Sequence, residues 1–174
     1  GDFASPKTIN PVQLWWPDDT LADIHMMFRH PTEHIETLVS LKPHMVIIHA
    51  EAEGDLSGMI EHLKRLGIKV GVALLQATSV KDAENLIRIT DHVLIFSGTL
   101  GSFGGTADAS LLSKVDDIKQ IRQDIEIGWD GGINRGTVKE LMRGGVDVLN
   151  VGGAIQRSDD PKKAYQELRE LITA

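Results

Sequence analysis

Short apolar stretches rich in β-branched residues alternate along this chain with longer stretches that carry apolar residues at helical spacing. The short stretches are apolar almost throughout, which is typical of strands buried on both faces of a parallel sheet. We expect strands at residues 22–28, 44–50, 69–75, 92–98, 125–131 and 147–153. The pattern therefore predicts six strand–helix units that follow one another with no linker between them.

The stretches between these strands predict helices with recognisable ends. The expected helices, each with its capping residue, are 80–90 after Ser79, 135–143 after Asn134 and about 161–172 after Asp160. A further helix at residues 55–66 ends at Gly67 and has an apolar stripe formed by Leu56, Met59, Ile60, Leu63 and Leu66. Residues 1–16 are expected to form a long active-site loop and a helix.

Regular alternation of strands and helices predicts either a closed (β/α)₈ barrel or an open doubly wound sheet. In an open dinucleotide-binding fold, the glycine-rich turn follows the first strand. Here the glycine-rich turns come late, at residues 101–105, 131–132 and 152–153. Backbone amides that follow the last strands of a barrel commonly bind phosphate. We therefore predict an α/β fold of the (β/α)₈ TIM-barrel type.

The length of 174 residues corresponds to one domain, and we expect residues 1–174 to form a single barrel domain. A barrel of this type has eight strand–helix units and this chain has six, and the two missing units belong at the N-terminal end of the barrel. The first two strands are thus expected to be missing from this chain. A start at Gly1 without an initiator Met favours a fragment of a longer protein over a natural short form.

Composition excludes several classes of protein. With 41% apolar and 25% charged residues the chain is globular rather than disordered, and without cysteine it has neither disulfides nor thiol catalysis. A net charge of −7 argues against a nucleic-acid partner. The longest apolar runs, such as residues 45–48, are too short to cross a membrane. No signal-like start is visible, so we expect a cytoplasmic protein.

Five motifs occur in order along almost the whole chain. They read ADIHMM at residues 22–27, GVAL at 71–74, GSFGG at 101–105, WDGGIN at 129–134 and VGGAI at 151–155. Each motif alone is weak, but their order and spacing resemble those of the ribulose-phosphate 3-epimerase family. The resemblance runs from the third strand of that family's barrel to its end.

The resemblance implies a (β/α)₈ barrel that inverts a carbon next to the ketone of a sugar phosphate. The substrate would be ribulose 5-phosphate, xylulose 5-phosphate or a related hexulose 6-phosphate. Two aspartates on opposite faces exchange the proton, and a divalent Zn, Mn or Fe ion held by two His and two Asp stabilises the enediolate. Six units alone would leave two sheet edges open, which invites association, and we expect a homo-oligomer.

Three residues match functional positions of that family. Asp130 matches its late aspartate, a metal ligand and acid/base, although an Asp here could simply cap the glycine turn. His25 matches a metal-binding histidine, with a buried, backbone-bonded histidine as the alternative. Met27 matches a methionine near the reacting carbon, with core packing as the alternative. His49 does not match a ligand of the family, so we expect it to form structural hydrogen bonds or to line the pocket.

The phosphate site implied by the motifs depends on main-chain amides, which glycine lets an anion approach closely. Tight turns without a ligand are the alternative for any one of these segments. The residues expected to bind substrate or phosphate, besides Met27, are Gly104, Gly105, Gly131, Gly132, Gly153 and Ala154.

The chain departs from the family pattern in three places. The family carries His-x-Asp and then Met-Asp-Gly on its second strand, and Gly1 aligns just after that motif, so the opposing aspartate and two of the four metal ligands would lie upstream. The loop FSGTLGS at residues 96–102 replaces a pattern with Met and Asn-Pro, and LQAT at 75–78 replaces an Asn-Pro-Gly-Thr-like turn. These changes leave the identity of the sugar open.

Two other functions compete with epimerisation. The missing ligands and the altered loop are compatible with a catalytically impaired paralogue that only binds a phosphosugar. A lyase resembling the hexulose-phosphate synthases is disfavoured, because those enzymes carry Asp-x-Lys at the third strand. This chain has Asp23-Ile24-His25 there.

Overall fold

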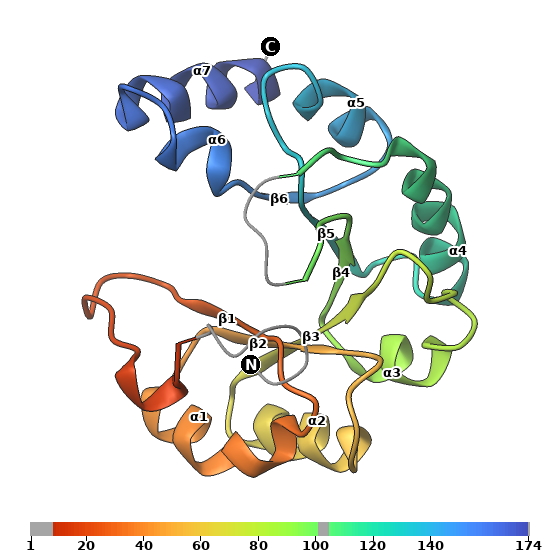
Figure 1. Ribbon diagram of the computed structural model, residues 1–174. Helices are drawn as coiled ribbons and strands as arrows, with labels where there is room; N and C mark the ends of the chain where they lie inside the picture. The colour runs from red at the N-terminus through yellow and green to blue at the C-terminus, as the bar shows by residue number, and fades with distance from the viewer. Residues whose placement is uncertain (1–8, 101–104, 174) are drawn as a thin grey trace.

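The computed structural model describes residues 9–100 and 105–173, and its six strands form one parallel sheet in sequence order (Figure 1). All six strands lie inside the stretches predicted from the sequence. Their bounds are β1 Asp23–Met26, β2 Met45–His49, β3 Lys69–Leu74, β4 His92–Phe96, β5 Glu126–Asp130 and β6 Val148–Asn150.

The helices lie on the outer side of this curved sheet (Figure 1). Within the described residues, β1 and β6 each pair with one neighbour, so the sheet is an open half-barrel. The predicted α/β barrel class is confirmed, with six strands in this chain. The helix bounds are α1 Ile35–Leu41, α2 Leu56–Arg65, α3 Glu84–Ile89, α4 Ser113–Ile121, α5 Val138–Arg143, α6 Gly153–Gln156 and α7 Pro161–Thr173, with 3₁₀ turns η1 Pro11–Gln13, η2 Pro31–His34 and η3 Ala109–Leu112.

Alternation along each strand sorts the side chains into two layers. Val46 and Ile48 of β2 pack outward with the helices, in the same cluster as Met59. Met45 and Ile47 of the same strand belong to a separate inner cluster, together with Ala73 and Leu94. The same alternation places the last inward residues of five strands around the mouth of the half-barrel: His25, His49, Phe96, Asp130 and Asn150.

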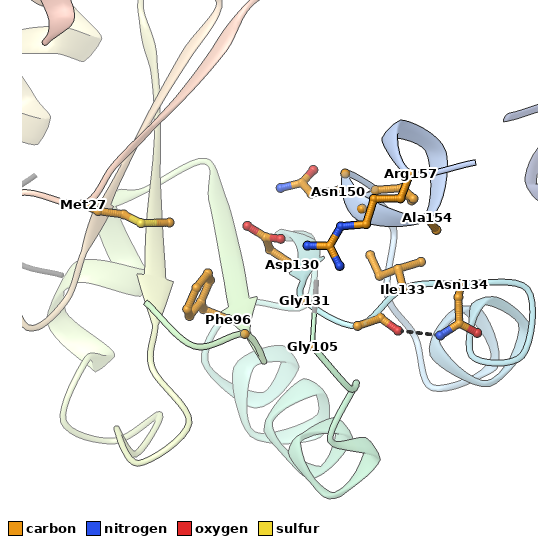
Figure 2. A pocket seen from close by; sticks show the side chains of 15 residues that line it. Met27, Phe96, Gly105, Asp130, Gly131, Ile133, Asn134, Asn150, Ala154 and Arg157 are labelled. Atoms are coloured by element: carbon orange, nitrogen blue, oxygen red, sulfur yellow. Dashed lines mark hydrogen bonds between the residues drawn. The ribbon is translucent and has the colours of Figure 1, made fainter. Parts of the chain in front are cut away.

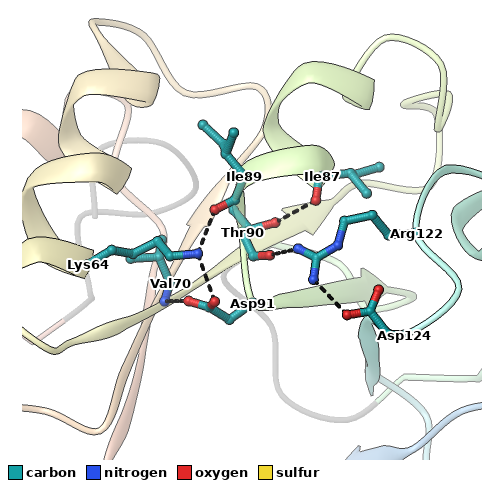
Figure 3. A network of polar contacts seen from close by, with 8 residues as sticks. All are labelled: Lys64, Val70, Ile87, Ile89, Thr90, Asp91, Arg122 and Asp124. Carbon is teal, nitrogen blue, oxygen red and sulfur yellow. Dashed lines mark hydrogen bonds and ion pairs between the residues drawn. The ribbon is translucent and has the colours of Figure 1, made fainter.

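At the opposite end of the sheet, a polar network fixes the turn that precedes β4 (Figure 3). The carboxylate of Asp91 accepts from the Val70 N–H at 3.0 Å and from the Lys64 ammonium at 2.8 Å. The Arg122 guanidinium donates to the carbonyl of Thr90 and to the Asp124 carboxylate. Because this end of a barrel lies away from the site of chemistry, the network serves stability.

Three helix boundaries differ from the predictions. The helix α2 ends at Arg65, one residue earlier than predicted, and Leu66, predicted to belong to its apolar stripe, is 51% exposed. Ser79 accepts from the Asp82 N–H as expected, but it caps a turn, and α3 begins only at Glu84. Likewise α5 begins at Val138 rather than directly after Asn134, so in both cases a turn separates the polar cap from the helix.

The helix predicted within residues 1–16 is wrong for the part of that segment that the structure describes. From residue 9 onward it contains only the three-residue turn η1. The turn ends at Leu14, whose backbone is extended (φ −78°, ψ 139°). Trp15 is 82% exposed, whereas Trp16 packs against the cluster of β1, β2 and α2.

Across the described residues, no helix has both the length and the apolar character needed to span a membrane. The assignment of residues 1–174 to a single domain, the homo-oligomer and the cytoplasmic location stay predictions.

Candidate active site

Asp130 is the last residue of β5 and faces the mouth of the half-barrel. Its backbone carbonyl accepts from the Ser97 N–H at 2.8 Å, which extends the pairing of β4 with β5 to the ends of the strands. In the parallel register Asp130 lies beside Asn150 of β6, so both side chains project from the same face. The Asp130 carboxylate is therefore held at the carboxyl end of the sheet, where barrels carry their chemistry.

His25 of β1 reaches the same place from the other end of the sheet. Its Nδ1 lies 3.6 Å from Oδ2 of Asp130, and its Nε2 lies 2.9 Å from Nε2 of His49. Burial holds the pKa of His25 below its ordinary value, and this outweighs the Asp130 carboxylate, which acts to raise it. Burial thus favours the neutral ring, which has one nitrogen lone pair to offer.

His49 is completely buried and belongs to a hydrogen-bonded group that leads away from the pocket. Its Nδ1 lies 3.3 Å from Oε2 of Glu51. The other oxygen of Glu51 accepts from the Leu75 N–H at 3.0 Å and from the Thr78 hydroxyl in a short contact. Burial acts to raise the pKa of Glu51, but hydrogen bonds from His49, Thr78 and Leu75 leave that pKa below its ordinary value.

Phe96, the last residue of β4, packs edge-on against both histidine rings. Its ring centroid lies 5.7 Å from that of His25 and 5.8 Å from that of His49. The two imidazoles are themselves stacked, with centroids 4.9 Å apart. The Phe96 ring thus restricts the orientations available to both histidines.

A pocket of about 640 Å³ opens beside Asp130 (Figure 2), a size suited to a small molecule. Figure 2 shows Met27 on the β1 side and Arg157 on the α6 side, with the Asp130 carboxylate between them. The lining residues are Met27, Phe96, Gly98, Gly105, Asp130, Gly131, Gly132, Ile133, Asn134, Asn150, Val151, Gly152, Gly153, Ala154 and Arg157.

The turn after β5 requires glycine at two positions. Gly131 and Gly132 have φ of +110° and +70°, and an added Cβ would lie 2.3 Å from the Gly98 nitrogen or 1.9 Å from the Ala107 nitrogen. The indole N–H of Trp129 donates to the Gly131 carbonyl at 2.9 Å and holds the turn from the outer side. The turn thus packs closely on the backbone at Gly98 and Ala107, and its own main chain lines the pocket.

Most residues predicted to bind substrate or phosphate lie around this one pocket. Met27, Gly105, Gly131, Gly132, Gly153 and Ala154 all line it, and Gly104 lies outside the described residues. The helix that follows Gly152 is α6, which has only four residues. Its dipole is therefore small, and any anion binding there depends on individual amides.

Sequence reasoning missed Asn150 and Arg157, which also line the pocket. Neither belongs to a motif, and the available signals were indirect. Asn150 is a polar residue in an otherwise apolar strand, directly before the VGGAI motif. Arg157 follows that motif two residues later. The guanidinium of Arg157 points into the pocket toward Asp130 (Figure 2).

Within residues 9–100 and 105–173, no group of three or more His, Cys, Asp or Glu side chains is arranged to hold a metal ion. His25 and Asp130 bring one imidazole nitrogen and one carboxylate oxygen together. The described residues thus present two of the four ligands that the resemblance implies.

Comparison with known proteins agrees with this geometry. The model of the family described as the ribulose-phosphate 3 epimerase family matches residues 5–156. The chain is 30% identical to the ribulose-phosphate 3-epimerase of Bacillus subtilis, over 97% of this chain and 82% of that protein. It is 32% identical to the ribulose-phosphate 3-epimerase of Helicobacter pylori, over 98% of this chain and 82% of that protein.

Solved structures share the fold at lower identity. KGPDC from Streptococcus mutans superposes with a TM-score of 0.70 at 14% identity, over 89% of this chain and 73% of that chain. The 3-hexulose-6-phosphate synthase of Salmonella typhimurium gives 0.66 at 20% identity, over 81% and 67%. These likenesses concern the fold alone. The matched motifs, the half-barrel and the similarity over most of the chain together show that the protein belongs to the ribulose-phosphate 3-epimerase family.

Proposed function

We propose that this protein takes part in the metal-dependent epimerisation of a ketose phosphate at C3. The substrate class is ribulose 5-phosphate and xylulose 5-phosphate or a related hexulose 6-phosphate. The observation that carries the proposal is the Asp130 carboxylate, which stands in the pocket between the glycine turns and the β1 side, within 3.6 Å of His25.

The phosphate of the substrate would bind at the glycine turns. Gly132 and Gly153 come from the turns after β5 and β6, so two backbone segments approach the anion from neighbouring strands. Arg157 adds a cation to this wall, and guanidinium groups suit the geometry of phosphate oxygens. A net-negative protein can hold an anion here because the local charge comes from oriented amides and one guanidinium.

Asp130 would exchange the proton on one face of C3. Its carboxylate accepts the C3 proton, the C–H electron pair moves toward the C2 carbonyl, and an enediolate forms. Return of a proton to the opposite face of C3 inverts that centre. The pocket residues include a single carboxylate, that of Asp130, so an acid on the other face must come from outside the described lining. The family pattern has that aspartate ahead of the position of Gly1.

A divalent metal would be held by His25 and Asp130, which fit it in chemistry and spacing. An imidazole nitrogen and a carboxylate oxygen are suitable ligands for Zn²⁺, Mn²⁺ or Fe²⁺. Burial lowers the pKa of His25 and so favours its neutral form, which has a lone pair for such an ion. When bound, the ion supplies positive charge that stabilises the enediolate.

Binding without turnover is the second candidate. The described part of the chain brings together only two candidate metal ligands and one pocket carboxylate. This incomplete set weakens the case for epimerisation and favours binding without turnover. Phosphate anchoring by amides and Arg157 needs neither the metal nor a second acid.

The test is an assay of the complete gene product with Zn²⁺, Mn²⁺ or Fe²⁺ on a panel of C3-epimeric ketose phosphates. Conversion of one C3 epimer into the other supports the epimerase. Saturable binding of the phosphosugar without conversion under every metal supports the binding protein. For the 174-residue chain alone we expect binding with very low or no turnover.

A further inference from the structure

We propose that Asn150 is a specificity-determining residue that hydrogen-bonds the C4 hydroxyl of a pentulose 5-phosphate, next to the reacting carbon. The inference rests on the proposed function, in which C3 lies at Asp130 and the phosphate binds at the glycine turns. Asn150 lines the pocket and belongs to none of the sequence motifs.

Polar side chains are few in this pocket. Among the described residues that line it, they belong to Asp130, Asn134, Asn150 and Arg157. In a pocket of this kind, a small number of placed polar groups fixes the orientation of a ligand and provides its specificity. Asp130 and Arg157 already have roles in the proposed reaction, with the proton and with the phosphate. The two asparagines remain.

The side chain of Asn134 is used within the protein. Its Nδ2 donates to the carbonyl of Gly132 at 3.1 Å, and its Oδ1 accepts from the N–H of Gly136 at 2.8 Å. Both ends of this amide thus hold the turn between β5 and α5. Asn150 differs, because its half-buried side chain forms no hydrogen bond within the described part of the chain. Its amide therefore has two N–H donors and a carbonyl acceptor to offer to a ligand.

Asn150 lies between the two places that would hold the substrate. In the parallel register it is the neighbour of Asp130, and Figure 2 shows its side chain next to the Asp130 carboxylate. Asn150 is also the last residue of β6, directly before the turn that carries Gly153, another residue of the pocket wall. A ligand that reaches from the Asp130 carboxylate to Gly153 therefore passes the amide of Asn150.

The chemistry of the substrate identifies the group that meets this amide. In a pentulose 5-phosphate, C4 is the carbon between C3 and the C5 that carries the phosphate. With C3 at Asp130 and the phosphate at the glycine turns, the C4 hydroxyl falls beside Asn150. A hydroxyl and an amide can each donate and accept, so they form a compatible pair. A ligand that does not present this hydroxyl leaves the amide unpaired and binds less tightly.

This contact selects a configuration at C4 without interfering with inversion at C3. D-Ribulose 5-phosphate and D-xylulose 5-phosphate differ at C3 and share the configuration at C4. Asn150 can therefore hold both members of the epimer pair in the same way. L-Xylulose 5-phosphate differs from D-ribulose 5-phosphate at C4 alone, so its hydroxyl is directed away from the amide.

The experiment is calorimetric binding to the complete gene product, as the wild type and as Asn150→Leu. The ligands are D-ribulose 5-phosphate, L-xylulose 5-phosphate and inorganic phosphate. Leucine has nearly the shape of asparagine and no hydrogen-bonding atom. We expect the affinity for D-ribulose 5-phosphate to fall by about 3- to 10-fold, the range for one hydrogen bond between uncharged groups, and the other two affinities to stay within about twofold. Turnover at C3 during the measurement leaves C4 unchanged.

Asn85→Leu is the matched control, because Asn85 is exposed on α3 and does not line the pocket. Its three affinities should equal those of the wild type. If Asn150→Leu fails to fold, Asn150→Ala is measured with the same expectation.

Two results would overturn the proposal and leave the epimerase function standing. One is an unchanged affinity of the Asn150 variant for D-ribulose 5-phosphate. The other is an equal loss for D-ribulose 5-phosphate and for either L-xylulose 5-phosphate or inorganic phosphate. A wild-type protein that does not bind D-ribulose 5-phosphate would instead overturn the proposed function for pentuloses, and the role of Asn150 with it.

Discussion

The Nδ1 atom of His25 lies 3.6 Å from Oδ2 of Asp130, although β1 and β5 are four steps apart in the sheet. At a strand spacing of about 4.8 Å, four steps across a flat sheet cover roughly 19 Å. The two side chains can span only part of that distance. The contact therefore requires the sheet to curve strongly, which distinguishes a barrel wall from an open doubly wound sheet and brings distant strand ends to one mouth.

Arg157 should contribute to anion binding. Replacing Arg157 by Ala is expected to weaken binding of inorganic phosphate by about 3- to 10-fold, the range for a partly exposed charged contact. Arg157→Lys should recover part of the loss. Isothermal calorimetry measures the effect.

Arg135→Ala is the control for Arg157, since Arg135 pairs with Glu167 at 2.9 Å and does not line this pocket. Its phosphate affinity should equal that of the wild type. Equal affinity in the Arg157→Ala variant would mean that the guanidinium plays no part in binding the anion.

The glycine turn after β5 should tolerate no side chain at its second position. Gly132→Ala combines a left-handed φ of +70° with a Cβ placed 1.9 Å from the Ala107 nitrogen. We expect a loss of more than about 2 kcal/mol in the free energy of unfolding, together with weaker phosphate binding. Urea denaturation followed by circular dichroism gives the first quantity.

Gly67→Ala separates the cost of the left-handed backbone conformation from the cost of the steric clash. Gly67 also has a left-handed φ, +80°, but its added Cβ would meet no atom within 4 Å. This variant should lose only about 1 kcal/mol, the cost of the backbone conformation alone. A loss at Gly132 no larger than at Gly67 would show that the close approach to Ala107 is absent in solution.

Glu51 should make the stability of the protein depend on acid. Its pKa is below the ordinary value of 4.5 in the folded protein, so the folded state holds its proton less tightly than the unfolded chain. The stabilising contribution of the carboxylate is therefore complete above about pH 4.5 to 5 and is lost as the pH falls through the folded pKa.

A series of urea titrations from about pH 7 to pH 3 checks whether the stabilising contribution of Glu51 is lost in acid. The difference in the free energy of unfolding between the wild type and Glu51→Gln should shrink as the pH falls below about 4.5. A difference that stays constant over that range would contradict the ionised, hydrogen-bonded state of Glu51.

The sequence predicted the strands and the glycine turn after β5 well, because both leave local signals. A strand such as β2, Met45–His49, is buried on both faces and reads as a continuous apolar run. The Gly131-Gly132 pair is required by backbone geometry and stands out in the sequence for that reason. Helix starts were less accurate, since a capping residue such as Ser79 can fix a turn as readily as a helix.

The second layer of the site could not be read from the sequence. His49, Glu51 and Lys114 are brought together by strand order and by packing of α4 beneath the loop after β3. Contacts of this kind produce no regular spacing of residues in the sequence. Arg157 belongs to a turn whose direction depends on how α6 and α7 pack. Local chemistry was thus predictable, whereas contacts between elements required the structure.

The most direct test of the central claim is exchange of the C3 proton in D₂O. The complete gene product, with its metal and a ketose phosphate, should place deuterium at C3. Asp130→Asn should slow this exchange by at least about 100-fold while phosphate affinity stays within about twofold, because amides and Arg157 bind the anion. Exchange at the wild-type rate in Asp130→Asn would contradict the role assigned to this carboxylate.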